Sequence, residues 1–431
     1  MKHSLHFVVL ALSLSFTLFS SNALAGFNEG FEAYKKGDYP GALREWQLIA
    51  LAGDADAQVN LAVMYKAGQG VPQDYKEAAK WFGIAATKGN AAAQYSLGAM
   101  YAQGQGVPQD YKEAAKWIKL AAAQGDAFAQ YGLASMHENG QGVPQDYMEA
   151  MRLYRLSADQ KIANAQYSLG MMYARGTGVT QDYSEATKWL RLAANQKQAN
   201  AQNMLGDLYY LGMGVARDYN EAAKWYRLAA DQGNGRARYL LGGMYQNGWG
   251  VPQDFGQTRN LYQLAAVQGN VDAQVALGRM YENGQLDQNG KGVLQDYKLA
   301  VKWFRLAADQ GNAIGQYSLG RMYSSGRGVP QDYQEALKLY RLAADQGQPR
   351  AQFNLGAMYD NGWGVPLNRV LAYALFILSG TGEPTLDVLS QTNRDNLAKS
   401  MSAKEVEAAQ NLARGMAKPG NFLKALDGYA R

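Results

Sequence analysis

Side chains that carry out enzyme or metal chemistry are scarce in this sequence of 431 residues. It contains no cysteine and three histidines, and two of these, His3 and His6, lie at the very start of the chain. Zinc sites usually need several cysteine or histidine ligands, and Cys-His or Ser-His-Asp catalytic groups need a histidine beside the nucleophile. Because only His137 lies beyond the start, we predict no metal site, no cofactor, no catalytic residue and no enzymatic activity.

Paired carboxylates do recur, but their positions indicate a structural role. An aspartate is followed three residues later by a glutamate, as in Asp110 and Glu113. Aspartate is a favoured N-cap residue, and a glutamate at the third helical position can complete a capping box. The other pairs are Asp74 and Glu77, Asp146 and Glu149, Asp182 and Glu185, Asp218 and Glu221, and Asp332 and Glu335. We therefore interpret these pairs as helix starts and not as general acids and bases.

The first residues predict export from the cytoplasm. Lys2 supplies a positive charge, residues 7–19 are almost wholly apolar or small, and Ala23-Leu24-Ala25 is a small-x-small cleavage pattern. We expect residues 1–25 to be a signal peptide that is cut near Ala25, and the protein to be periplasmic or secreted. The alternative is an uncleaved N-terminal anchor. No comparable apolar stretch follows, so no integral membrane segment is expected after cleavage.

The charge pattern argues against nucleic acid as a partner. The formal net charge of +5 becomes +4 when Lys2 is removed with the signal peptide (5 − 1), and the basic residues are scattered among acidic ones. Such a distribution forms no basic stripe that could follow a phosphate backbone. Because an exported chain without cysteine has no disulfides, its stability must come from an apolar core.

Internal repetition is the dominant feature, and it must position every other candidate residue. An Ala-Gln dipeptide, or a close variant of it, recurs at a spacing of 36 residues, with one step of 42. The copies of this dipeptide begin at Ala57, Ala93, Ala129, Ala165, Ala201, Ala237, Ala273, Gly315 and Ala351. Nine copies in register predict a serial architecture.

The copy over residues 93–128 shows how one repeat should fold. Ala93, Leu97 and Met100 recur at steps of three and four, which predicts an apolar stripe on a first helix, here called helix A. Gly98 lies within this helix, where glycine costs about 1 kcal/mol against alanine, so we expect a neighbouring helix to approach closely. A glycine-rich turn then leads to the aspartate cap and a second helix, called helix B.

The recurring pattern resembles the Sel-1-like repeat, a relative of the tetratricopeptide repeat (TPR) with a longer linker. The resemblance rests on L-G-x-M-Y, G-x-G-V-P-Q-D-Y and E-A-x-K-W-x-x-x-A-A-x-x-G, and it covers about residues 27–416. It implies an all-α fold, a right-handed superhelical α-solenoid whose A helices line a concave face used for protein–protein contact. A cysteine-rich branch of this family has been linked with β-lactam hydrolysis, but its paired cysteines are missing here.

The ends differ from the inner copies, because a terminal repeat must cover a face that inner repeats bury against each other. We expect an N-terminal capping helix pair over residues 26–56 and nine repeats over residues 57–382. C-terminal capping helices and a tail should follow over residues 383–431, with a capping box at Ser402 and Glu405. The residues after Pro419 are expected to be loosely held.

Candidate binding residues lie on the helix A surface that the TPR pattern places in the concave groove. The residue two before the repeated leucine is aromatic in most copies. These candidates, here called the aromatic ladder, are Tyr95, Tyr131, Tyr167, Tyr239, Tyr317 and Phe353. Aromatic anchors dominate many interfaces, so the ladder is suited to bind an extended or helical segment of a partner. The alternative is that these rings pack between neighbouring A helices.

Differences between copies add further candidates. Arg279 and Arg321 follow the repeated leucine by two residues, where they either bind an acidic partner or form a solvated surface. Trp249 and Trp363 lie between two linker glycines, either as contact residues or docked on the adjacent repeat. Six extra residues around 286–291 enlarge one linker, as a feature of one face or as neutral drift.

Three positions depart from the pattern without suggesting chemistry. His137 takes the place of a tyrosine in other copies and is interpreted as a substituted core residue. Lys161 and Lys197 replace the glycine at the end of helix B, where a left-handed residue is expected. A side chain in that conformation costs roughly 1 kcal/mol, so we predict a bend or a softer region there.

Together these features predict an exported, monomeric scaffold that binds a protein partner through the concave groove. The partner would be a host protein or an envelope regulator. One alternative is an envelope structural or glycan-associated protein, in which tyrosine and tryptophan stack on peptidoglycan sugars. A β-lactam or peptidoglycan hydrolase is the remote alternative.

Overall fold

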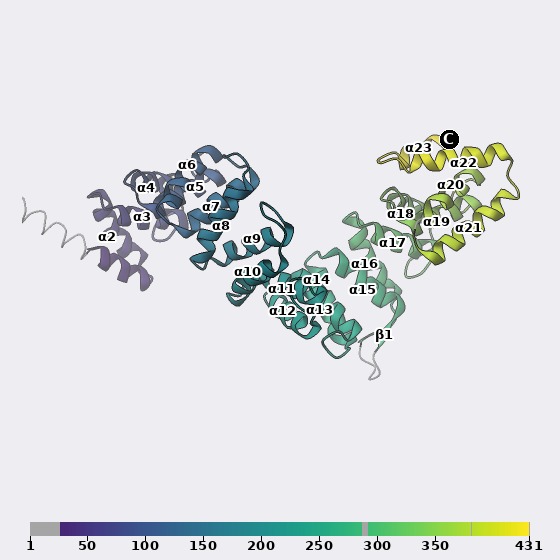
Figure 1. Cartoon of the computed structure of the whole chain (residues 1–431), viewed down its shortest axis with the longest axis horizontal. Coiled ribbons are helices and arrows are strands. Elements are labelled where there is room, and N and C mark those ends of the chain that lie inside the picture. The colour runs from purple at the N-terminus through teal and green to yellow at the C-terminus, as the bar shows by residue number, and fades with distance from the viewer. Residues whose placement is uncertain (1–25, 287–291, 381, 431) are drawn as a thin grey trace, which may run out of the picture. The chain divides into compact units, whose positions relative to one another are not determined.

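The computed structural model describes residues 26–286, 292–380 and 382–430, and most of them are helical (Figure 1). The predicted signal peptide and most of the predicted insertion lie outside the described residues. Within these ranges, no helix is both long enough and apolar enough to cross a membrane. The chain divides into two compact units, residues 1–217 and 218–431.

The first unit consists of paired antiparallel helices that follow one another along the chain. It begins with a helix over residues 26–35. Its further elements are α2 (Tyr39–Leu51), α3 (Ala55–Ala67), α4 (Tyr75–Thr87), α5 (Ala91–Gln103), α6 (Tyr111–Ala123), α7 (Ala127–Asn139), α8 (Tyr147–Asp159), α9 (Ala163–Arg175), α10 (Tyr183–Asn195) and α11 (Ala199–Leu211). From α3 onward, each odd-numbered helix is a helix A and each even-numbered helix is a helix B.

The second unit continues the same alternation and adds a small hairpin. Its repeat elements are α12 (Tyr219–Asp231), α13 (Gly235–Asn247), α14 (Phe255–Val267), α15 (Val271–Asn283), β1 (Gln285–Leu286), β2 (Gly292–Val293), α16 (Tyr297–Asp309), α17 (Ala313–Ser325), α18 (Tyr333–Asp345), α19 (Pro349–Asn361) and α20 (Arg369–Ser379). The closing helices are α21 (Pro384–Ala398), α22 (Ala403–Met416) and α23 (Phe422–Ala430). β1 and β2 pair antiparallel on either side of the enlarged linker.

The predicted close approach of helices A and B is confirmed. A Cβ added at Gly98 would lie 2.6 Å from Cγ1 of Ile118 and 2.9 Å from the carbonyl oxygen of Ala114. Ala114, Ile118 and Ala121 are buried on helix B, opposite Leu97 of helix A. The glycine therefore lets α5 and α6 pack at short range, which offsets its cost to helix A.

The glutamine of the Ala-Gln motif links consecutive repeats. Gln166 is 3% exposed, and its Nε2 donates to the carbonyl oxygen of Ala158 at 3.1 Å. Its Oε1 accepts from Nε2 of Gln196 at 2.8 Å. Carbonyl groups in the last turn of a helix lack intrahelical donors, so the glutamine provides one at the end of helix B. A buried amide is stable here because both of its ends are bonded.

The aspartate caps are confirmed, but the predicted boxes with glutamate are wrong. Oδ1 of Asp110 accepts from the backbone N–H groups of Lys112 and Glu113, at 2.8 and 3.1 Å. The N–H of Asp110 itself donates to the carbonyl oxygen of Tyr101, so the glutamate has no free donor to reach. Glu113 pairs with Lys116 instead. Only the predicted box at Ser402 and Glu405 closes in both directions, among the helices described.

The lysines at the two unusual junctions do adopt the left-handed conformation. Lys161 has φ 67° and Lys197 has φ 64°, whereas other described residues with positive φ are glycines. Both lysine side chains are exposed. The predicted strain is therefore present in the backbone, and the predicted bend or softer region stays a prediction.

The predicted loose C-terminal tail is wrong, whereas the predicted domain bounds stay a prediction. Helix α3 begins at Ala55, two residues before the predicted start of the repeats, because Asp54 accepts from the N–H of Ala57 and caps it. The residues after Pro419 are not loosely held, because they form α23. Phe422 and Leu426 of this helix are buried in the core formed with α18, α20 and α22.

Candidate partner-binding surface

The ladder residues of the first unit are half-buried against the core. The ring of Tyr131 packs against Tyr154 of helix B in the same repeat, with ring centroids 5.6 Å apart. The ring of Tyr95 packs against Phe128 on the next helix A, with ring centroids 6.4 Å apart. Burial raises the pKa of Tyr95 above its ordinary value. These rings thus contribute to packing and still present part of their surface to solvent.

The ladder of the second unit is built in the same way. Tyr239 stacks on Tyr262, with ring centroids 5.5 Å apart. Tyr317 and Phe353 pack against Tyr340 and Phe376, at 6.1 and 5.3 Å respectively. Each partner ring in this unit lies on helix B of the same repeat, whereas Tyr95 of the first unit contacts the next helix A. All the candidate ladder rings are half-buried.

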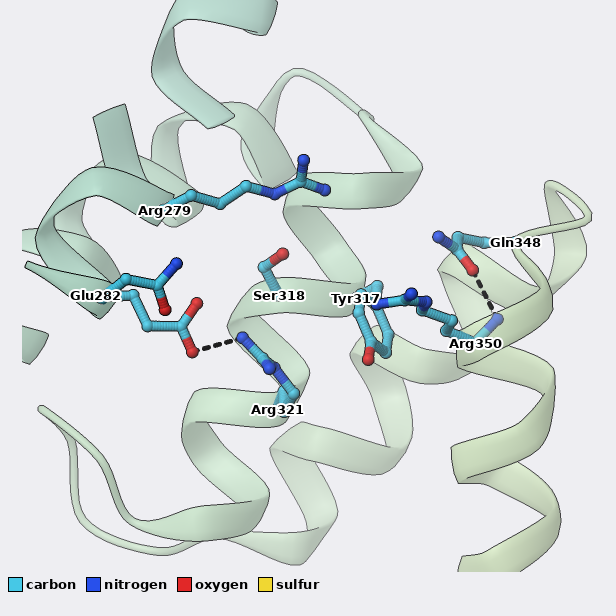
Figure 2. Close-up of a pocket in the computed structure, with 8 residues that line it drawn as sticks. Arg279, Glu282, Tyr317, Ser318, Arg321, Gln348 and Arg350 are labelled. Atoms are coloured by element: carbon cyan, nitrogen blue, oxygen red, sulfur yellow. Dashed lines mark hydrogen bonds and ion pairs between the residues drawn. The ribbon is translucent and has the colours of Figure 1, made fainter. Parts of the chain in front are cut away.

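Three consecutive A helices of the second unit line a polar, partly open cavity of about 340 Å³ beside the ladder (Figure 2). It brings together both of the predicted arginines. The lining residues are Arg279, Glu282 and Asn283 from α15, Tyr317, Ser318 and Arg321 from α17, and Gln348 and Arg350 at the start of α19. Arg279 extends into this cavity from one side, and Arg350 lies on the other side next to Tyr317 (Figure 2).

Two of the three arginines are held by carboxylates. Arg321 pairs with Glu282, whose side chain is 8% exposed. Arg350 forms a bidentate pair with Glu383 at the start of α21, and this pairing lowers the pKa of Glu383. Arg321 also lies over the ring of Tyr317, 5.9 Å from its centroid. Sequence reasoning identified Arg279 and Arg321 but missed Arg350 and Glu282.

The reason why Glu282 pairs with an arginine lies on helix B of its own repeat. In two other copies the same position of helix A accepts a hydrogen bond from a buried helix B tyrosine, and the first is Glu138, which accepts from Tyr154 at 2.6 Å. Gln246 accepts from Tyr262 in the same way at 2.8 Å. The corresponding helix B residue beside Glu282 is Phe304, which has no hydroxyl. The carboxylate therefore turns to Arg321 of the next repeat.

The two linker tryptophans dock on the adjacent repeat, and their predicted role as contact residues stays a prediction. Trp249 stacks on Tyr219 of the preceding helix B, with centroids 5.9 Å apart and planes at 17°. Trp363 stacks on Tyr333 in the same way, at 6.0 Å and 14°. Trp249 is still 40% exposed and Trp363 is 46% exposed. Both rings are therefore docked on the adjacent repeat and accessible to a ligand.

No cluster of metal-ligating side chains occurs in the part of the chain that the structure describes. His137 is half-buried on α7, and its Nδ1 lies 3.3 Å from the carbonyl oxygen of Pro144. This contact ties helix A to its own linker. The position thus has a structural role, as expected for a substituted tyrosine.

Comparison with known proteins agrees with this architecture. A family model described as the Sel1 repeat matches residues 55–90, 91–126, 127–161, 163–197, 199–234, 235–270, 271–312, 313–348 and 349–381. A protective antigen of uropathogenic Escherichia coli strains, with an SLR fold, is 31% identical over 96% of both chains, with a TM-score of 0.59. A Sel1 repeat protein from Oxalobacter formigenes is 32% identical over 73% of this chain and 89% of its own, with a TM-score of 0.57.

No match was found among curated proteins. The predicted α-solenoid and the predicted resemblance are both confirmed by the nine family matches and by the solved structures. Sel1 repeats, like TPRs, build scaffolds that typically mediate protein–protein interaction. Because the matched repeats span most of its length, the chain belongs to the Sel1 repeat family.

Proposed function

We propose that this protein is an exported scaffold that binds a segment of a host protein or an envelope protein on its A-helix face. The observation that carries the proposal is the aromatic ladder, because its rings are half-buried and four of the six pack against a buried ring of helix B. Side chains that are fixed before binding lose little rotamer freedom in the complex. Rigid aromatic rings also supply much of the binding energy in known interfaces.

Export is supported by the signal-like start of the sequence. The relative with 31% identity is described as a protective antigen, which fits a protein that is accessible outside the cytoplasm. Cell fractionation of the full chain with a C-terminal tag should place it in the periplasm or the medium. The N-terminal sequence should begin at Gly26, and a cytoplasmic protein that retains residues 1–25 would contradict export.

Partner binding can be tested by placing a photo-crosslinking phenylalanine derivative at Tyr131. The matched control position is Tyr111, which is 37% exposed at the start of helix B and lies outside the ladder. Crosslinking in periplasmic and secreted fractions should capture a discrete protein from position 131 and not from position 111. Equal products at both positions would show that the ladder is not the binding surface.

The captured protein then allows a quantitative test. Tyr131→Leu and Tyr167→Leu keep an apolar side chain against the core and remove the aromatic ring. We expect each substitution to weaken binding by about tenfold, which corresponds to the loss of one aromatic contact. Tyr111→Leu should have little effect, and circular dichroism should show unchanged helix content in all three variants. Unchanged affinity in both ladder variants would remove the ladder from the proposal.

A glycan-associated function is a second candidate, and the two stacked tryptophans favour it. Trp249 and Trp363 each present an accessible indole beside a linker turn, and sugars stack on such rings. Sedimentation with purified peptidoglycan in high salt tests this candidate. Retention that is lost in the Trp249→Ala and Trp363→Ala double variant would support it, and no retention of the wild-type chain would exclude it.

A further inference from the structure

The arginine cavity of α15, α17 and α19 is not balanced in charge. Arg279, Arg321 and Arg350 contribute three positive charges, and Glu282 and Glu383 contribute two negative ones. The cluster therefore has a net charge of +1 (3 − 2). Charges that line a cavity and lack a counter-charge favour a ligand of opposite sign.

The unbalanced charge lies on Arg279. Among the residues described in this structure, Arg279 has no carboxylate partner, whereas Arg321 and Arg350 each have one. Its side chain points into the cavity toward Ser318 (Figure 2). The guanidinium Nε of Arg321 is also buried without a hydrogen-bond acceptor among the described residues. The cavity thus holds donors in excess of its acceptors.

The charge balance favours a carboxylate over a phosphate. One carboxylate would neutralise the net charge of +1, and its two oxygens match the planar guanidinium of Arg279. A phosphate monoester carries nearly two negative charges near neutral pH. Its second charge would lie close to the buried carboxylate of Glu282, which is fixed on Arg321 at the wall of the cavity. The repulsion between them would offset the gain from the arginines.

The neighbouring ladder ring indicates what accompanies the carboxylate. Tyr317 belongs both to the cavity wall and to the aromatic ladder, and Arg321 lies over its ring. A residue next to the bound carboxylate would therefore meet an aromatic surface. We infer that this cavity binds one aspartate or glutamate side chain of a protein segment, next to an apolar or aromatic residue that packs on Tyr317. The inference rests on the proposed function, since it specifies what this part of the A-helix face binds.

Calorimetric titration with short, end-blocked peptides tests the inference. The probe has one glutamate between two phenylalanines, and its partners replace the glutamate with glutamine or with phosphoserine. The glutamate peptide should bind the mature chain about tenfold more tightly than the glutamine peptide, the difference expected for one charge-assisted contact. The phosphoserine peptide should bind no more tightly than the glutamate peptide. A phosphoserine peptide that binds tenfold more tightly, or equal binding of glutamate and glutamine, would overturn the inference.

Variants identify the site. Arg279→Gln should lower the affinity for the glutamate peptide to that for the glutamine peptide. The control, Arg414→Gln, makes the same change in charge on α22, where the arginine is exposed and far from the lining residues in sequence, and should leave affinity unchanged. Glu282→Gln raises the net charge to +2 and should favour the phosphoserine peptide selectively. Unchanged glutamate binding in Arg279→Gln, or no binding of the wild-type chain at millimolar peptide, would refute the site.

These outcomes are separate from the outcome for the scaffold itself. If the partner captured at Tyr131 still binds while the peptides do not, the carboxylate site is wrong and the proposed function stands. If no partner is captured and the peptides do bind, the site exists without the proposed ladder. The two experiments use different units of the chain, so one result does not determine the other.

Discussion

Replacing Lys161 and Lys197 with glycine should stabilise the first unit. Both residues have positive φ, at 67° and 64°, and the same junction in most other repeats is a glycine with positive φ. The left-handed conformation costs an ordinary residue about 1–2 kcal/mol. Glycine removes this cost. It also gives the unfolded chain more conformational freedom, which lowers the stability of the folded state by about 0.4–1 kcal/mol.

The net gain should therefore be about 0.5–1 kcal/mol for each site. The lysine side chains add little to oppose it, because both are exposed. The backbone bonds of this turn are retained, since glycine keeps the N–H groups that donate to Ala158 and Ala194 at 2.9 and 3.0 Å. The two sites are 36 residues apart in sequence and follow different helices, α8 and α10, so their effects should add to about 1–2 kcal/mol.

Urea unfolding measures the gain in stability, and hydrogen exchange shows which residues it affects. The double variant should unfold at higher urea, and exchange should slow across residues 155–205, where the wild-type chain should exchange faster than its neighbouring repeats. Lys88→Gly is the matched control, because Lys88 has φ −82° and precedes the junction glycine. That substitution should lower the free energy of unfolding by about 0.5–1 kcal/mol. Uniform exchange across the wild-type chain would refute the reasoning. A change in stability of the same sign in the double variant and in Lys88→Gly would also refute it.

Three other predictions follow from buried contacts. Gln166→Leu removes the donor to Ala158 and the acceptor for Gln196, and should cost about 1–2 kcal/mol in urea unfolding, with faster exchange at the end of α8. Gly170→Ala places a Cβ 2.7 Å from Cγ of Leu190, and should cost about 1–2 kcal/mol after the gain in helix propensity. Burial raises the pKa of Tyr340 to about 12 from 10.0, so unfolding is favoured as pH rises between these values. Tyr340→Phe should shift the alkaline unfolding midpoint, followed by tyrosinate absorbance, to higher pH, and an unchanged midpoint would contradict this.

The repeated elements were predictable because their signals are local. Asp110 caps its helix through N–H groups two and three residues away, and Gly98 meets Ile118 within the same helix pair. Each such signal recurs at the same position in most of the repeats, which distinguishes it from a chance match. Helix α23 was missed because it belongs to no repeat, and the burial of Phe422 depends on a surface formed by distant helices.

Side-chain hydrogen bonds between repeats were not predictable, because each side chain has several possible partners. Arg155 and Arg227 on helix B each donate to the hydroxyl of a tyrosine on the next helix A, Tyr173 and Tyr245, at 2.8 and 2.6 Å. The sequence shows both residue types at fixed spacing but does not show that they meet. A search for pairs 18 residues apart that recur together could have found them.

The arginine cavity shows how a difference between repeats can change the partner of one buried side chain. In the two repeats with Tyr154 and Tyr262 on helix B, the tyrosine hydroxyl donates to the acceptor on helix A, and the pair is closed within its own repeat. Phe304 lacks that hydroxyl, so Glu282 pairs with Arg321 of the next repeat and fixes it beside Tyr317. Arg279 then has no carboxylate of its own among the described residues. The charged surface that a partner can complete therefore arises from three residues together: a phenylalanine without a hydroxyl, the carboxylate of Glu282 and the guanidinium of Arg321.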